Sequence, residues 1–275
     1  MIQIKNFMDW ESPGIALITG ASSGIGAAFA RELASQKFNL VLVARRKEKL
    51  EQIASELEDQ HAISAHILVT DLSKLDEIKR VYEYITKLDE IDILINNAGF
   101  GTLGYFDNTP LEPNIDMIFV HNIASTYFCR ATLPIMIKSG RGVIINVASL
   151  AVIVQLPHNA IYNATKSFLR SFTETLHMEL EDTCVKVQCL CPGFTSTEFH
   201  EVGDFEGFDR SLIPESSWMT PEEVVKLSLK AVPENEVVFI PGEAKQAFAK
   251  LWANPKLGAR TRRNMIKLFK LPRKK

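Results

Sequence analysis

Residues 15–26 read IALITGASSGIG, an apolar run followed by a turn that contains three glycines. The run predicts a buried strand, and the apolar pattern that continues from Ala27 predicts a helix directly after the turn. Gly20, Gly24 and Gly26 let the backbone turn sharply and approach a diphosphate, which the free N–H groups of the helix start attract. The spacing is G-x-x-x-G-x-G, and we interpret the loop as a dinucleotide-binding turn. A glycine-rich turn without a ligand is the alternative.

The rest of the chain repeats this alternation of strand and helix up to about residue 240. Strands that are apolar without alternation indicate burial on both faces, which is typical of a parallel sheet joined by right-handed crossovers. We therefore predict a single-domain, Rossmann-type doubly wound α/β fold with about seven strands. The expected strands are 15–19, 39–43, 64–69, 91–96, 142–147, 186–190 and 237–240. The expected helices are 24–36, 46–60, 74–88, 111–137, 158–181 and 221–231.

Length and composition narrow the class of protein. The chain has 275 residues, 46% of them hydrophobic, which is enough for one large domain with a sizeable core. There is no run of about 18 apolar residues, and Lys5, Asp9 and Glu11 interrupt the segment where a signal peptide needs an apolar stretch. We expect a cytoplasmic protein. The cysteines are too few for a disulfide framework and lack the spacing of a zinc site, so we expect buried thiols and no metal: Cys129, Cys184, Cys189 and Cys191.

Charge is concentrated at the C-terminus. The formal net charge is −2, yet residues 260–275 hold eight cations and no acid, so residues 1–259 carry a net charge of −10. An acidic body disfavours nucleic-acid binding. We expect residues 1–242 to form a dinucleotide-binding catalytic domain and residues 243–275 to form a helical extension packed on it, with a solvated basic tail. Peripheral contact of this tail with an anionic membrane is the alternative.

The second predicted strand ends just before Arg45 and Arg46. In dinucleotide-binding folds this position selects the cofactor, because an acid there holds a ribose 2′-hydroxyl whereas an arginine bonds a 2′-phosphate. The two arginines predict NADP(H) rather than NAD(H). We expect Arg45 to be the main selector, with Arg46 free to point elsewhere. The alternative is that both are solvated at the start of a helix.

Tyr162 and Lys166 stand four residues apart, on one side of a predicted helix. A tyrosine keeps its proton until about pH 10, and a fixed cation beside it favours the phenolate. The pair is suited to exchange a proton with a substrate oxygen, although a tyrosine and a lysine at this spacing also occur by chance on many helices.

Together these motifs resemble the short-chain dehydrogenase/reductase family, of the compact single-domain type, from about residue 14 to residue 242. The motifs that carry the resemblance stand in the family's order. They are the loop of residues 19–26, Asp71, Asn96-Asn97-Ala98-Gly99, Asn122, Ser149, Tyr162 with Lys166, and Pro192-Gly193-Phe194-Thr195-Ser196-Thr197.

The resemblance implies a role for each motif. Residues like Asp71 and Leu72 line the adenine pocket, and Asn96 helps to pin the central strands. The turn after the sixth strand approaches the nicotinamide carboxamide, with Thr195 and Thr197 as alternative donors. The cofactor contacts expected on this basis are Gly20, Ser22, Ser23, Gly24, Ile25, Gly26, Arg45, Arg46, Asp71, Leu72, Asn97, Ala98, Gly99, Tyr162, Lys166, Pro192, Gly193, Thr195 and Thr197.

Carbonyl reduction needs a hydride donor, a proton donor, and a group that holds the substrate oxygen while charge develops. We assign Tyr162 as the proton donor and Ser149 as the second hydrogen bond to that oxygen. Lys166 is the cation expected to lower the phenol pKa and to bind the cofactor ribose. Asn122 resembles the family asparagine that shapes the active site and supports a proton relay through water. The expected protein is an NADP(H)-dependent oxidoreductase that interconverts a carbonyl and an alcohol on a small apolar substrate.

The sequence leaves alternatives open for the substrate pocket, the oligomeric state and the class of function. Residues 100–106, 150–156 and 194–218 are expected to shape the substrate pocket, the last as a lid, with ordinary aromatic packing as the alternative. The family implies a homodimer or homotetramer built through the helices at 111–137 and 158–181. The rival functions are a non-catalytic dinucleotide-binding sensor or scaffold, an epimerase or dehydratase that uses bound cofactor, and a hydrolase with a Ser/Tyr/Lys centre.

Overall fold

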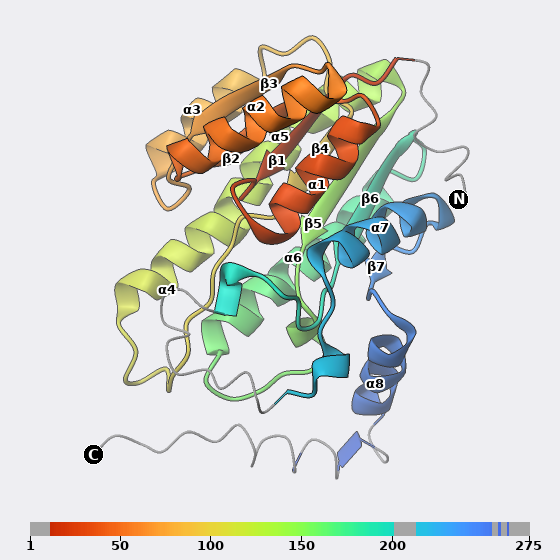
Figure 1. Ribbon diagram of the computed structural model, residues 1–275. Coiled ribbons are helices and arrows are strands. Elements are labelled where there is room, and N and C mark those ends of the chain that lie inside the picture. Colours follow the sequence, from red (N-terminus) through yellow and green to blue (C-terminus); the bar gives the residue numbers. More distant parts are fainter. Residues whose placement is uncertain (1–11, 201–212, 255–257, 260–262, 264–275) are drawn as a thin grey trace.

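A parallel sheet organises the chain. The computed structural model describes residues 12–200, 213–254, 258–259 and 263. Within these residues seven parallel strands form one sheet in the order β3-β2-β1-β4-β5-β6-β7 (Figure 1). Strand order reverses between β1 and β4, which is where such folds bind ligands. The strands are β1 (Ile15–Thr19), β2 (Asn39–Ala44), β3 (Ala65–Val69), β4 (Ile93–Asn96), β5 (Gly142–Val147), β6 (Val185–Leu190) and β7 (Val238–Phe239).

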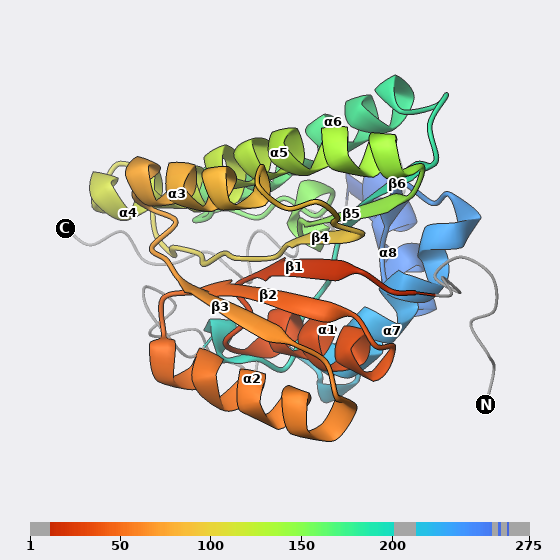
Figure 2. The ribbon, with the colours of Figure 1, turned by 90° about the horizontal axis from the view of Figure 1, so that it is seen from above.

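Helices cover both faces of the sheet (Figure 2). One layer contains α1 (Gly24–Ser35), α2 (Lys47–His61) and α7 (Pro221–Ala231); the opposite layer contains α3 (Leu75–Ile85), α5 (Ala124–Ser139) and α6 (Ala160–Glu179). Neighbouring residues of one strand enter different cores: Ile18 packs with the first layer and Leu17 with the second. Burial on both faces explains why these strands do not alternate with polar residues. The predicted doubly wound α/β fold is confirmed.

Element boundaries agree with the sequence prediction to within about three residues, with one difference of kind. The stretch 111–137, expected to be a single helix, consists of α4 (Leu111–Ile118), the π-helical turn η1 (Phe119–Ile123) and α5. A π-turn inserts an extra residue and leaves carbonyls without their usual partners. Two hydroxyls bond carbonyls of this turn: Ser125 donates to the His121 carbonyl at 2.7 Å and Thr126 to the Asn122 carbonyl at 2.8 Å.

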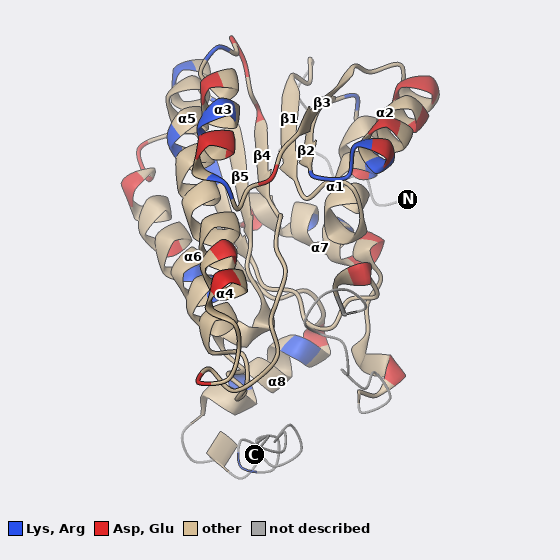
Figure 3. Cartoon of the chain, turned by 90° about the vertical axis from the view of Figure 1, so that its left-hand side faces the viewer, with Lys and Arg blue, Asp and Glu red and all other residues tan. Residues whose placement is uncertain are grey.

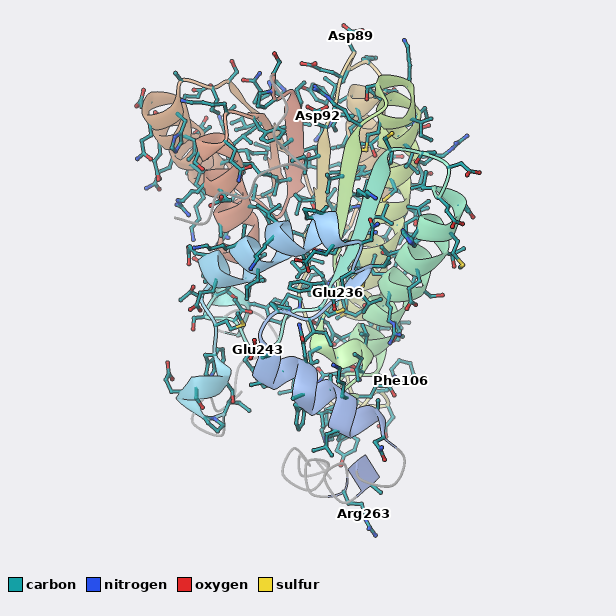
Figure 4. The ribbon with its side chains drawn as sticks, turned by 90° about the vertical axis from the view of Figure 1, so that its right-hand side faces the viewer. Asp89, Asp92, Phe106, Glu236, Glu243 and Arg263 are labelled. Carbon is teal, nitrogen blue, oxygen red and sulfur yellow. The ribbon has the colours of Figure 1, made fainter. Side chains whose placement is uncertain are left out.

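Polar contacts in the interior fix the central strands at both ends. The Asn96 amide, at the end of β4, donates to Asn146 Oδ1 on β5 at 2.8 Å, which confirms the pinning role expected of Asn96. At the other end, the buried Asp92 carboxylate accepts from the Gly14 N–H at 2.7 Å and from Arg141 Nε at 2.9 Å. Figure 4 shows Asp92 and Phe106, before and after β4, at opposite ends of the molecule.

The cysteines differ in part from expectation. Cys129, Cys189 and Cys191 are buried, as expected, but Cys184 is exposed because it lies in the turn before β6. All four are free thiols.

Helix α8 (Glu243–Ala253) follows β7. Its Ala249 packs with Leu169 and Ile240, and Trp252 is buried. Most of residues 255–275 lie outside the described part of the chain, so the two-part organisation and the basic tail stay predictions. Among the described helices, none has the length and apolarity that crossing a bilayer requires.

Candidate active site

A cleft of about 620 Å³ lies along the carboxyl edge of the sheet. Its lining comes from the segments that follow β1 to β6, where a doubly wound sheet places its ligands. The lining includes every predicted site residue except Gly26 and Asn122. Residues that are up to about 180 positions apart in sequence therefore meet in one cleft.

The glycine loop has a backbone that only glycine adopts easily. Gly20 and Gly24 have φ angles of 66° and 56°, in the left-handed region. A Cβ atom on Gly20 would come within 2.8 Å of Asn97 Nδ2. Gly26 does not line the cleft, but a Cβ there would collide with the Gly20 carbonyl, so Gly26 permits α1 to start against the loop. The first N–H groups of α1 are thereby held at the cleft, where they suit a diphosphate.

Thr19 joins this loop to the segment after β4. Its hydroxyl donates to the Ile95 carbonyl at 3.3 Å and accepts from the N–H groups of Asn97 and Ala98 at 2.9 and 3.0 Å. The Asn97 side chain returns a bond to the Thr19 carbonyl at 2.9 Å. The two walls of the cleft that the resemblance assigns to diphosphate and ribose are therefore held in one rigid unit.

Tyr162, Lys166 and Ser149 converge at the end of the cleft beyond β5. Lys166 Nζ is buried, lies 5.7 Å from the centre of the Tyr162 ring and donates to the Val147 carbonyl at 2.9 Å. Ser149 caps the short helix η2 (Leu150–Val152) by accepting from the Ala151 N–H at 3.1 Å. Tyr162 is partly buried and lines the cleft. A polar oxygen in the cleft can therefore meet both hydroxyls.

The pKa of Tyr162 differs from the sequence expectation, which was that Lys166 lowers it. Burial raises the pKa of Tyr162 to about 12, while a hydrogen bond with Ser149 opposes this rise. Burial also lowers the pKa of Lys166 to about 8. The expectation was wrong because it counted the neighbouring charge and not the loss of water around both groups. In this state the phenol holds its proton and is a donor.

The chain matches the family model described as short chain dehydrogenase over residues 14–204. The protein belongs to the short-chain dehydrogenase/reductase family. It is 38% identical over 233 residues to an NADP-dependent 3-hydroxy acid dehydrogenase of Schizosaccharomyces pombe, covering 82% of this chain and 88% of the relative. It is 32% identical to a very-long-chain 3-oxoacyl-CoA reductase of Anas platyrhynchos, covering 80% and 70% of the two chains.

Solved structures of the family agree. A short-chain dehydrogenase from Sphingobium yanoikuyae in complex with NADPH superposes with a TM-score of 0.77 at 32% identity, over 86% of this chain and 92% of that one. The protein is thus an oxidoreductase of the type that transfers hydride between a nicotinamide cofactor and a carbonyl or alcohol. The glycine loop fits such a dinucleotide, because its left-handed backbone at Gly20 and Gly24 lines the cleft and brings the start of α1 to it.

Asn122, the family-type asparagine, lies outside the cleft lining. It is buried in the π-turn, and its amide donates to the Thr165 carbonyl at 2.9 Å. Thr165 stands on α6 directly before Lys166, so Asn122 is bonded to the helix that carries Tyr162 and Lys166. A relay role for Asn122 stays a prediction.

His121 lies behind the cleft lining, against the Tyr162 ring, and the sequence interpretation did not select it. It is buried, and its Nε2 accepts from the Phe100 N–H at 3.2 Å, so Nδ1 carries the proton and donates to Thr165 Oγ1 at 2.9 Å. Burial, together with the charge of Lys166, holds the pKa of His121 well below its usual value. A neutral histidine thus joins the loop after β4 to α6. Nothing in a helical periodicity distinguishes it from a core histidine.

Basic residues gather where β2 runs into α2 (Figure 3). Both arginines line the cleft, but the sequence interpretation let Arg46 point elsewhere, and the structure differs. Arg46 turns back over the glycine loop and donates to Ser22 Oγ at 3.0 Å and Ser23 Oγ at 2.6 Å. Its guanidinium also meets Glu198, a residue that the sequence interpretation did not select. An arginine side chain is long enough to fold back over the preceding loop, and the sequence alone does not show which way it points.

The lowered pKa of Lys166 predicts how cofactor affinity depends on pH. The ammonium is charged below about pH 8 and neutral above it, so its attraction for ribose oxygens weakens as pH rises through that value. We expect NADPH affinity, measured by fluorescence titration, to fall about threefold to tenfold between pH 7 and pH 9. In Lys166→Met this pH dependence should disappear. A flat wild-type profile contradicts the assignment of Lys166 to the cofactor.

Proposed function

We propose that the protein is an NADP(H)-dependent carbonyl reductase or alcohol dehydrogenase in which Tyr162 is the general acid and base. The observation that carries the proposal is the convergence of Tyr162, Ser149 and Lys166 at one end of a cleft whose other end holds Arg45 and Arg46. The NADPH-bound family structure and the NADP-dependent relative support the choice of cofactor.

Ser149, Tyr162 and Lys166 have separate roles in the proposed reaction. Bound NADPH supplies the hydride. Ser149 donates a hydrogen bond to the substrate oxygen and Tyr162 transfers its proton there as charge develops. Because burial raises the pKa of Tyr162 to about 12, the phenol is protonated before reaction, as reduction requires. The Lys166 ammonium lies 5.7 Å from the centre of the Tyr162 ring, and its charge suits the ribose hydroxyls.

The substrate end of the cleft favours apolar compounds. Phe100, Val120 and Phe199 line it, and the Phe199 ring lies 6.0 Å from the Tyr162 ring. The two curated relatives named above act, by their names, on a 3-hydroxy acid and a 3-oxoacyl thioester. We therefore propose 3-oxo and 3-hydroxy acyl compounds with apolar chains as the first substrates to test. The rest of the proposed lid, residues 201–212, lies outside the described residues.

We propose that copies of the chain associate through α5 and α6, because apolar side chains of these helices are exposed. Ile137, Phe168 and Met178 are 47%, 45% and 64% exposed, and Phe168 stacks on Phe172. Such side chains are typical of a surface that another protein covers. Sedimentation velocity distinguishes the expected homodimer or homotetramer from a monomer. A cytoplasmic location and membrane contact by the basic tail stay predictions from the sequence.

Replacing Tyr162 tests the proposed function against a non-catalytic sensor. Tyr162→Phe keeps the ring and removes the proton, so the turnover number should fall about a thousandfold while NADPH affinity changes less than about twofold. Tyr82→Phe, on α3 and packed against Tyr127, is the matched control and should keep full activity. Turnover by purified Tyr162→Phe at the wild-type rate contradicts the assignment; a wild type that binds NADPH and reduces no carbonyl compound favours the sensor.

Separate replacement of the two arginines tests cofactor choice. Because the Arg46 guanidinium is fixed on Ser22 and Ser23, we expect Arg46→Ala to reduce the preference for NADPH over NADH by about tenfold to a hundredfold in kcat/KM. Arg45→Ala should also shift the preference if Arg45 is a selector as the sequence suggests. If both variants keep the wild-type ratio of kcat/KM for NADPH to kcat/KM for NADH, neither arginine selects the cofactor by binding its 2′-phosphate.

A further inference from the structure

The segment after β6 crosses the cleft. Residues 194–199, here called the strap, begin beside the catalytic end and pass over the glycine loop. Thr197 Cγ2 lies 3.0 Å from where a Cβ on Gly24 would stand, and the strap is tied at its base by the Ser196 N–H, which donates to the Met219 carbonyl at 2.9 Å. A dinucleotide in the cleft must therefore lie against the strap.

Glu198 of the strap bonds two cations at the start of α2, Arg46 directly before the helix and Lys49 in its first turn. Its Oε2 accepts from Arg46 Nη1 at 2.6 Å, and its Oε1 accepts from Lys49 Nζ at 2.6 Å. About 150 residues separate these partners in sequence, so the contact exists only because the strap returns across the cleft. The bonds from Lys49 and Arg46 lower the pKa of Glu198 to about 2. The carboxylate is ionised at every pH at which the fold would work.

The groups around this carboxylate form an anion site at the adenosine end of the cleft. Arg46 contributes a forked donor, Lys49 an ammonium, and Ser22 and Ser23 two hydroxyls that already contact the guanidinium. Such a set of donors suits the oxygens of a phosphate monoester. Glu198 supplies two oxygens and one negative charge to the same cations. The side chains of Arg46, Lys49 and Glu198 are 42%, 43% and 38% exposed, so solvent screens these ion pairs and another anion can reach both cations.

We propose that Glu198 holds the place of the cofactor 2′-phosphate on Arg46 and Lys49, so that binding of NADP(H) exchanges one anion for the other and detaches the strap from α2. The inference rests on the proposed use of NADP(H). A phosphate carries up to two negative charges against one for the carboxylate, so it wins the exchange, whereas NADH leaves Glu198 in place. Glu198 is thus a residue that sets cofactor affinity by competing for its site.

Removing the negative charge of Glu198 tests the exchange. We expect Glu198→Gln to bind NADPH and adenosine 2′-monophosphate about tenfold more tightly than the wild type, because the cations no longer have to be freed. Affinity for NADH and adenosine 5′-monophosphate should change less than about twofold. Glu51→Gln is the matched control, since it removes one negative charge from α2, the helix that carries Lys49, and Glu51 forms an ion pair with Lys47 at 3.6 Å. Its affinities should equal those of the wild type.

Hydrogen exchange provides the second readout. Without any ligand, strap amides of Glu198→Gln should exchange faster than those of the wild type and of Glu51→Gln. Unchanged or weaker NADPH binding by Glu198→Gln overturns the inference while leaving the proposed function intact, provided that the wild type binds NADPH. Unchanged strap exchange overturns the attachment of the strap by Glu198. A wild type that binds NADH but not NADPH, or neither, overturns the proposed cofactor and this inference together.

Discussion

The buried ammonium of Lys166 is the constraint on which the site depends. Moving an ammonium out of water raises its free energy, and burial accordingly lowers the pKa of Lys166 to about 8. The Val147 carbonyl, at 2.9 Å from Nζ, replaces part of the lost hydration. A second buried cation beside it would be unstable, and the neighbouring His121 is accordingly held neutral. The fold thus keeps a cation buried beside the Tyr162 ring.

The fold brings the parts of this centre together through a few short bonds. Val147 ends β5, Lys166 stands on α6, and the π-turn between α4 and α5 aims Asn122 at the Thr165 carbonyl next to Lys166. His121 contacts the same threonine through its hydroxyl, which in turn donates to the Tyr162 carbonyl at 2.9 Å. The π-turn thus contacts the helix that carries Tyr162 and Lys166 through two of its side chains. Such turns are frequent at functional sites.

Much of this could be predicted from the sequence, for physical reasons. Strands such as β1 and β5 were located to the residue because buried parallel strands are continuous apolar runs, and the glycine loop was visible because left-handed backbone needs glycine. The π-turn was not visible, because its side-chain pattern resembles that of an α-helix. The ion pairs of Glu198 form because the strap, residues 194–199, passes back across the cleft, and no local sequence pattern predicts that path. The predicted direction of the Tyr162 pKa shift was wrong because burial, its dominant cause, is a property of the fold.

The proposed function requires a hydride from the nicotinamide and the proton of Tyr162 to reach the same carbonyl group. The most direct measurement is mass spectrometry of the alcohol formed from an apolar 3-oxo acyl ester, with NADPH deuterated at both positions of the reduced nicotinamide carbon. We expect a single deuterium, on the carbon that bore the carbonyl oxygen, because the hydroxyl hydrogen exchanges with solvent and carries no label. An alcohol without deuterium at that carbon, formed while NADPH is consumed, would contradict it.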